Sequence, residues 1–398
     1  MSEMSYLEKL LDGVEVEWKS LGDVVNFQRG RRLVKSQLET RGKYAVYQNS
    51  MTPLGYYHEY NVAAQSSFII CAGAAGEIGY SENEFWAADD VHFAITPEYI
   101  NDRFLFHFLL TQKNKISGQV RRASIPRLSK SVIEKLEFPI PCPDNPEKSL
   151  AIQSEIVRIL DKFTALTAEL TAELNMRKKQ YNYYRDQLLS FKEGEIEWKT
   201  LEEVLVDKFW IMPATPKFDD NGEIPYVTSK NISGGNIDFE RVKHISRDDF
   251  LSISKNRPIL KGDFLISMIG TIGEIARVKC LDPDFYGQNM YLIRLNEELL
   301  NPRYFLHFFD SPRMKFYFKS VKNNSGQGYL KANNIDGLSI PLPSIDEQQK
   351  IAFILDKFDT LTNSITEGLP REIELRQKQY EYYRDLLFSF PKPETVSN

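Results

Sequence analysis

Hydrophobic residues between Ile152 and Leu188 recur at spacings of four and three, which is the pattern of one face of a long helix. The pattern has one stutter, between Leu170 and Leu174. It predicts a helix over about residues 147–189, roughly 60 Å long at about 1.5 Å per residue. A second seam of this kind runs from Ile351 to Leu387. Because such seams are buried against other helices, we expect the two segments to pair as long antiparallel coiled-coil helices.

The two helical segments differ near their middles. The first contains Thr-Ala-Glu-Leu written twice, as Thr167–Leu170 and Thr171–Leu174. The second is four residues longer over the matching span, and it contains Gly368-Leu369-Pro370. Because proline kinks or breaks a helix, we expect a kink or a break at this point of the second segment, which leaves open whether it is one helix or two.

The chain also contains two copies of one long unit, and the order of the matching segments is kept throughout. Each copy opens on a tryptophan segment, passes a Pro-x-Pro element and ends on Tyr-Tyr-Arg-Asp. The matching pairs are Val16–Leu21 with Ile196–Leu201, Gly76–Ile78 with Gly273–Ile275, Leu105–Phe108 with Phe305–Phe308, Pro139–Pro141 with Pro341–Pro343, Leu160–Phe163 with Leu355–Phe358, and Gln180–Asp186 with Gln379–Asp385. The unit is longer than a solenoid repeat, so we interpret each copy as a domain with an attached helical segment.

The ends of the copies match closely, whereas their middles match only at scattered points. Both middles mix short β-like runs, such as Ser67–Ile70 and Asp263–Ser267, with glycine-rich turns and one helical stretch. The expected fold class is therefore two α/β (α+β) domains in a pseudo-two-fold repeat, joined by the coiled-coil helices. The predicted segments are a stub at 1–14 that packs on the C-terminal helix, domains at 15–147 and 193–344, helical spacers at 148–192 and 345–391, and a tail at 392–398.

Basic residues gather at corresponding places in the two middles, although the net charge is -5. Residues 111–135 hold seven basic residues and one acid, and residues 301–331 hold six and one. A further cluster contains Arg29, Arg31, Arg32 and Lys35. A solvated basic face would explain one such window, but two in register favour contact with DNA at two separate places.

Candidates for reading bases come from polar loops that align between the copies. The side chains differ in type at the aligned positions, as two domains that read different bases would require, although each residue could equally form a turn. With the basic residues, the predicted DNA-binding set is Arg29, Arg31, Arg32, Gln48, Asn49, Asp89, Asp90, Arg121, Arg122, Ser124, Arg127 and Lys130 in the first copy, and Thr228, Ser229, Lys230, Asn231, Gln288, Asn289, Lys322, Gln327, Tyr329, Lys331 and Asn333 in the second.

Motifs for catalysis are not found. Cys71, Cys142 and Cys280 are too far apart to suggest a disulfide framework or a zinc site, and we find no nucleotide-binding loop. His107 and His307 lie among Phe and Leu, so we interpret them as packed histidines. No stretch is long and apolar enough to span a bilayer and the start lacks a signal pattern, so we expect a cytoplasmic protein without a membrane partner.

Together these segments resemble the specificity subunits of type I restriction–modification systems. The resemblance covers nearly the whole chain. It rests on Glu17–Leu21 and Glu197–Leu201, on Ile340–Pro343 followed by Glu347-Gln348-Gln349, and on the Tyr-Tyr-Arg-Asp endings. The opening Met1–Trp18 and the Thr-Ala-Glu-Leu tandem are similar to the IC subgroup, whereas Cys142–Ser149 departs from the family's Glu-Gln-Gln lead-in.

The resemblance implies a non-catalytic subunit with two target recognition domains, each reading one half of a split, asymmetric sequence in double-stranded DNA. It implies that the helices set the distance between the half-sites and bind two methyltransferase subunits, and that restriction (translocase) subunits complete the enzyme. S-adenosylmethionine, ATP and Mg are then expected on those partners, with no cofactor and no metal on this chain. Two alternatives stay open, namely a coiled-coil adaptor that binds only protein and an enzyme with an unrecognised active site.

Overall fold

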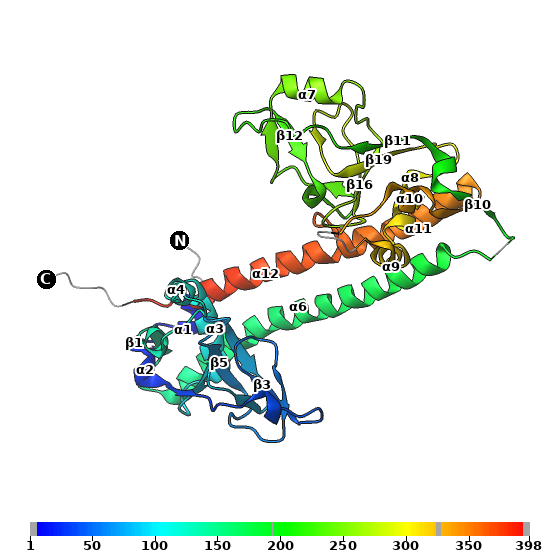
Figure 1. Ribbon diagram of the computed structural model, residues 1–398. Coiled ribbons are helices and arrows are strands. Elements are labelled where there is room, and N and C mark those ends of the chain that lie inside the picture. Colours follow the sequence, from blue (N-terminus) through cyan, green and yellow to red (C-terminus); the bar gives the residue numbers. More distant parts are fainter. Residues whose placement is uncertain (1–5, 193, 324–327, 393–398) are drawn as a thin grey trace. The chain divides into compact units, whose positions relative to one another are not determined.

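The structure is a computed structural model that describes residues 6–192, 194–323 and 328–392 (Figure 1). It divides into two compact units. Unit 1 comprises Met1–Leu170 with Glu372–Asn398, and unit 2 comprises Thr171–Arg371. The first and the last described residues thus belong to the same unit.

Unit 1 is built around a four-stranded antiparallel sheet in the order β2-β8-β5-β6. A second sheet, β4-β3-β7, pairs β3 with β7 in parallel, and a ribbon joins β1 to β9. Helix α3 packs against β5 and β6. The elements are α1 (Tyr6–Leu11), β1 (Val16–Ser20), α2 (Leu21–Val24), β2 (Asn26–Arg29), η1 (Lys35–Gln37), β3 (Tyr44–Tyr47), β4 (Gly55–Tyr57), β5 (Ser66–Ile70), β6 (Ile78–Ser81), β7 (Phe85–Ala87), β8 (Val91–Ile95), α3 (Asp102–Thr111), α4 (Lys113–Gly118), α5 (Lys130–Glu134) and β9 (Glu137–Pro141).

Unit 2 repeats this plan with a four-stranded sheet β11-β19-β16-β17, a three-stranded sheet β15-β12-β18 and a ribbon of β10 with β20. A hairpin of β13 and β14 is added. The elements are β10 (Glu197–Thr200), η2 (Leu201–Val204), β11 (Leu205–Ile211), β12 (Ile224–Val227), η3 (Ser229–Asn231), β13 (Ile232–Ser233), β14 (Asn236–Ile237), β15 (Lys243–Ile245), α7 (Arg247–Ser254), β16 (Phe264–Ser267), β17 (Ile275–Arg277), β18 (Tyr286–Gly287), β19 (Met290–Leu295), α8 (Pro302–Phe309), α9 (Pro312–Val321), α10 (Ala332–Asp336) and β20 (Ser339–Leu342). The predicted α/β (α+β) class and the internal repeat are confirmed.

One long helix follows the first domain, and two helices follow the second. The first, α6 (Pro146–Leu188), is one helix of 43 residues, as the hydrophobic seam predicts. The second seam forms two helices, α11 (Ile345–Asn363) and α12 (Gly368–Leu387), which confirms the predicted break. Gly368 has φ +79, and a Cβ at this position would lie 2.4 Å from the carbonyl oxygen of Thr360, so the turn that begins α12 requires glycine. No helix in the described part of the chain is long and apolar enough to cross a membrane.

The division into units does not follow the predicted helical spacers, because α6 and α12 each contribute residues to both units. Unit 1 holds α6 as far as Leu170 and α12 from Glu372, and the rings of Phe163 and Tyr383 stack there at 5.2 Å. Unit 2 holds the rest of α6 together with α11, where the rings of Tyr184 and Phe358 stack at 5.5 Å. Each domain is therefore packed against one helix that follows it directly and one that comes from the other copy.

A buried histidine joins the domain to both helices in each unit. In unit 1, His107 of α3 is fully buried, with Nε2 2.9 Å from Asp161 Oδ1 and Nδ1 2.8 Å from Tyr380 Oη. In unit 2, His307 of α8 makes the same two contacts. Its Nε2 lies 2.7 Å from Asp356 Oδ1, and its Nδ1 lies 2.9 Å from Tyr181 Oη. A neutral imidazole with its proton on Nε2 satisfies both contacts, donating to the carboxylate and accepting from the phenol. Both histidines are packed, as predicted from their neighbours.

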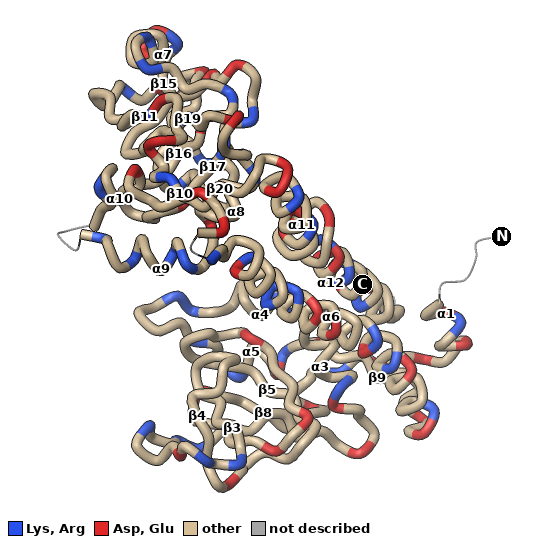
Figure 2. Tube along the Cα trace, turned by 90° about the vertical axis from the view of Figure 1, so that its right-hand side faces the viewer, with Lys and Arg blue, Asp and Glu red and all other residues tan. Residues whose placement is uncertain are grey.

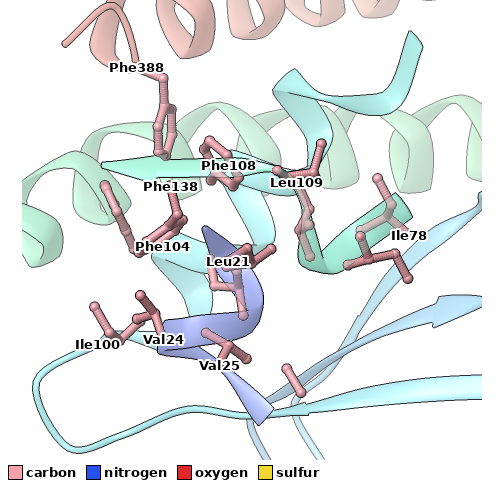
Figure 3. Close-up of a cluster of buried hydrophobic side chains, with 14 of the residues drawn as sticks. Leu21, Val24, Val25, Ile78, Ile100, Phe104, Phe108, Leu109, Phe138 and Phe388 are labelled. Carbon is pink, nitrogen blue, oxygen red and sulfur yellow. The ribbon is translucent and has the colours of Figure 1, made fainter. Parts of the chain in front are cut away.

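Aromatic residues at the end of the chain complete the core of unit 1. Phe388 lies 4.8 Å from Phe104 and 6.1 Å from Phe108 between ring centroids (Figure 3). Leu7 and Leu11 of α1 belong to the same core, so the predicted stub shares a core with the end of α12. Of the predicted tail, the structure describes Lys392 alone.

The Pro-x-Pro elements lie in strands, because β9 includes Pro139 and Pro141 and β20 includes Pro341. They precede the helices as the sequence indicates, but they also pair with the tryptophan strands, Pro139 opposite Trp18 and Pro341 opposite Trp198. Proline is tolerated there because each ribbon has only two strands and each strand keeps one unpaired edge.

We expect Phe388→Ala to destabilise unit 1 by about 3–5 kcal/mol, because it removes a buried ring from the core. Hydrogen exchange, read separately for peptides of the two units, measures the effect and should show reduced protection in unit 1. Phe316→Ala, which truncates a side chain that is 76% exposed, is the control and should change stability by less than about 0.5 kcal/mol. An equal decrease of protection in both units would contradict this assignment.

Asp102 makes the stability of unit 1 depend on pH. Burial raises the pKa of its carboxyl from 3.8 to about 6, although hydrogen bonds from Ser67 oppose the shift. A raised pKa means that the folded state favours the protonated carboxyl of Asp102. Its contribution to the free energy of unfolding is therefore complete below the unfolded pKa of 3.8 and is lost as the pH rises through about 6. Asp102→Asn should therefore be more stable than the parent above pH ~7, by about 1–3 kcal/mol, with the difference vanishing below pH ~4. Thermal unfolding at several pH values measures this, with the exposed Asp23→Asn as control, and a constant difference at every pH would refute it.

Candidate nucleic-acid interface

Backbone hydrogen bonds in unit 1 tie together the loops that carry the predicted DNA-binding residues. Cys71 N donates to Asp90 O at 2.7 Å, Gly73 N to Pro126 O at 3.1 Å, and Ala74 N to Asn49 O at 2.9 Å. The segment with Arg31 and Arg32 joins them, since Arg31 N donates to Ala87 O. Stretches that are distant in sequence thus form one loop cluster at the ends of β2, β3, β5 and β8, which we call loop cluster 1 (residues 29–32, 47–49, 71–76, 88–90 and 121–128).

Most predicted side chains of loop cluster 1 are open to solvent. Arg29, Arg31, Arg32, Asn49, Arg121, Arg122, Ser124 and Arg127 are exposed or partly exposed, and so are Gln48, Asp89 and Asp90. Lys130 lies just beyond the cluster at the start of α5, where its ammonium pairs with Glu134 at 2.8 Å. Six arginines on one set of loops give the density of positive charge that phosphate contacts require.

A cavity of about 220 Å³ lies within loop cluster 1, lined by Arg29, Cys71, Ala72, Asp89, Asp90, His92, Arg127 and Leu128. Burial raises the pKa of the Cys71 thiol to about 12, so the sulfur stays protonated at neutral pH. Burial, with the nearby charge of Arg29, lowers the pKa of His92, whose Nδ1 lies 2.9 Å from Cys71 Sγ. Both groups are therefore neutral, and the charges at this cavity come from arginines and carboxylates.

The equivalent loops of unit 2 are held in the same way. Gln288 N donates to Val227 O at 3.1 Å, Asn289 N to Ile211 O at 2.9 Å, and Thr271 Oγ1 to Ser229 O at 2.9 Å. Tyr329 bridges to Ile269 and to Asn323. We call this loop cluster 2 (residues 209–211, 227–231, 268–273, 288–289 and the described part of 322–334). Lys230, Lys331 and Asn333 are exposed or partly exposed in it, as are Thr228, Ser229 and Lys322.

Two of the residues predicted in unit 2, Asn231 and Gln327, do not join the candidate contacts. Asn231 is only 6% exposed, and its Oδ1 accepts from Thr228 N and Oγ1, both at 3.0 Å, while its Nδ2 donates to Arg241 O at 3.2 Å. Its side chain is thus occupied in building the turn. Gln327 lies outside the described residues.

The structure adds residues that sequence reasoning missed. In unit 2 a cavity of about 640 Å³ is lined by Phe218, Arg241, Lys243 and the turn at Ser229–Asn231, among others. Arg241 and Lys243 extend the positive charge of loop cluster 2, and basic residues recur along α9 as well (Figure 2). In unit 1 the missed residues are Cys71 and His92. Cys71, His92, Arg241 and Lys243 lie outside the two basic windows and the aligned polar loops, so only the strand pairing brings them to the site.

No group of three or more His, Cys, Asp or Glu side chains in the described ranges is arranged to hold a metal ion. The buried histidines do not fit acid–base catalysis either. Burial lowers the pKa of His107, whose two ring nitrogens are both engaged in contacts that hold helices.

Comparisons with known proteins agree with the duplicated architecture. A family model described as the type I restriction modification DNA specificity domain matches residues 13–177 and again residues 195–375. The chain is 43% identical to the EcoR124I/EcoR124II type I restriction enzyme specificity subunit of Escherichia coli, with 100% of both chains covered. It is 36% identical to the EcoprrI specificity subunit of Escherichia coli, covering 92% of this chain and 93% of the relative.

Solved structures share the fold. A crystal structure of the type I restriction–modification S subunit from M. genitalium superposes with a TM-score of 0.59 at 16% identity, covering 96% of this chain and 98% of the other. A chain from a structural study of complex assembly and conformational transition of the type I R-M system gives a TM-score of 0.52 at 15% identity, covering 94% and 97%.

We predict that Arg121→Ala combined with Arg122→Ala weakens DNA binding to a similar degree on every sequence, because phosphate contacts carry no base information. The slope of log affinity against log salt should become shallower by about 0.9 for each phosphate that the variant no longer neutralises. Fluorescence anisotropy with two duplexes of different sequence, each at several salt concentrations, measures both. Lys148→Ala with Lys162→Ala, two exposed residues of α6, is the control, and an unchanged slope in the arginine variant would remove these residues from the interface.

Proposed function

The chain belongs to the family of type I restriction–modification DNA specificity proteins, and we propose that it is the specificity subunit of such a system. Each recognition domain reads one half of a split, asymmetric DNA target. The observation that carries this function is the pair of loop clusters, which share their backbone bonding but differ in side chains. A coiled-coil adaptor that binds only protein has no support from the relatives, which are named as specificity subunits.

We also propose that this chain is not itself a catalyst and that S-adenosylmethionine, ATP and Mg act on its partner subunits. The partners are two methyltransferase subunits and the restriction subunits, and the complex acts on double-stranded DNA in the cytoplasm. Exposed aromatic side chains on the helices support docking of partner proteins, since Tyr183 of α6, Phe353 of α11 and Tyr382 of α12 are 61%, 62% and 65% exposed.

Methylation mapping at single-molecule resolution tests the proposed function. The chain would be expressed in cells with the methyltransferase subunit encoded beside it. A split adenine-methylated motif that disappears when this chain is deleted is the expected result. A motif that is independent of this chain would contradict the function, and methylation by the purified chain alone would contradict the non-catalytic role.

Inserting a third Thr-Ala-Glu-Leu after Leu174 should widen the gap between the two half-sites and leave both half-sites unchanged. The site lies inside α6, whose two parts belong to different units. Four helical residues add about 6 Å, close to two base-pair steps of about 3.4 Å. The same mapping experiment reads the gap directly, and a changed half-site with an unchanged gap would refute the spacer role.

A further inference from the structure

Two carboxylates stand within the otherwise basic loop cluster 1. Asp89 and Asp90 lie in the turn between β7 and β8, and their backbone carbonyls are fixed by Arg29 Nε at 2.6 Å and Cys71 N at 2.7 Å. Their carboxylates make no hydrogen bond or ion pair with any residue in the described ranges. The turn is thus held rigidly by its backbone, while both acidic groups remain available to a ligand.

Two arginines accompany these carboxylates at the same cavity of about 220 Å³. Arg29 is placed by its bond to Asp89 O, and Arg127 by a backbone pairing with Arg121. Neither guanidinium forms an ion pair with a described residue. The cavity therefore presents donors and acceptors side by side, with positive and negative charges in equal number.

Carboxylates are unfavourable on a surface that faces phosphates unless they accept hydrogen bonds from bases. In the major groove only the amino groups of cytosine and adenine donate, and Asp or Glu characteristically accepts from cytosine N4. Arginine is the usual partner of guanine O6 and N7. Arginine beside aspartate thus matches the two edges of a single G·C pair.

Unit 2 lacks this arrangement at the equivalent place. Strand pairing sets Arg29 opposite His92 in unit 1 and Trp210 opposite Tyr291 in unit 2. The bonds of Leu128 N to Cys71 O and of Leu330 N to Met268 O place Arg127 and Tyr329 in correspondence. The turn with Asp89 and Asp90 is replaced by Gln288 and Asn289. All four charges are therefore absent from the equivalent positions of unit 2, where the amides of Gln288 and Asn289 suit adenine better.

We propose that Asp89 and Asp90, together with Arg29 and Arg127, read a G·C pair within the half-site recognised by unit 1. This inference rests on the proposed function, and it assigns a base pair to one part of one recognition domain. Gln288 and Asn289 occupy the equivalent position in unit 2 and act on the other half-site only.

The test is methylation mapping in cells that express the methyltransferase subunit with either the parent chain or the variant Asp89→Asn/Asp90→Asn. The parent motif should require a G·C pair in one half-site. In the variant, discrimination at that single position should fall about tenfold or more, while the gap and the other half-site stay unchanged. Gln288→Ala/Asn289→Ala is the matched control and should relax a position in the opposite half-site.

Arg127→Gln provides a second variant in case the double substitution disturbs the fold, and it should relax the same base pair. Relaxation at an A·T pair, relaxation in both half-sites, or an unchanged motif in both variants would overturn the inference while leaving the specificity function intact. If no motif depended on the parent chain, the proposed function would fail, and the base assignment would fail with it.

Discussion

The contact on which both units depend is the buried histidine that bonds to one helix through a carboxylate and to another through a tyrosine. Buried imidazole is costly unless both ring nitrogens are satisfied, and here each has a single partner with the right role. Arginines also hold the two carboxylates, Arg103 that of Asp161 and Arg303 that of Asp356. Burial alone would raise the pKa of Asp356, but the hydrogen bond from His307 and the contact with Arg303 outweigh it and lower this pKa to about 2. Because tyrosine and aspartate must reach the same ring, a slip of either helix by one turn would break the contact. The histidine therefore fixes both helices against the domain.

This arrangement explains why the two copies are alike at their ends and different in their middles. The matching segments supply the histidine, its aspartate and the tyrosine, and in each unit the tyrosine comes from the helix of the other copy. The same backbone bonds then hold the loops of each domain, for example Leu128 N to Cys71 O and Leu330 N to Met268 O. Because these bonds join backbone atoms, many side chains on the loops can differ without loss of the fold. The residues proposed to read bases are thus different from the histidine, aspartate and tyrosine that hold the helices.

The sequence allowed the repeats, the long helix and the broken second helix to be predicted, because all three follow from local periodicity and proline chemistry. It also allowed the loops of the candidate site to be named, since they align between the copies. The cavity with Cys71 and His92 could not be predicted, because it depends on the register of β5 with β8. Likewise, only tertiary contacts reveal that the side chain of Asn231 is used by its own turn, or that Pro139 lies in a strand opposite Trp18. Local pattern thus predicts elements, whereas their pairing decides which polar groups remain free.

The carboxylate of Asp89 has no partner among the described residues, which separates it from the structural acid Asp102 of the same unit. Asp102 and Asp89 are both acids on or beside the same sheet, yet their surroundings differ. Ser67 donates to the carboxylate of Asp102 from its backbone N at 2.7 Å, and burial sets the pKa of that group. Asp89, by contrast, is fixed only through its carbonyl, so its carboxylate gives up no internal bond when a ligand replaces water. A side chain that is positioned by its backbone but unpaired at its tip can discriminate between bases without destabilising the domain that carries it.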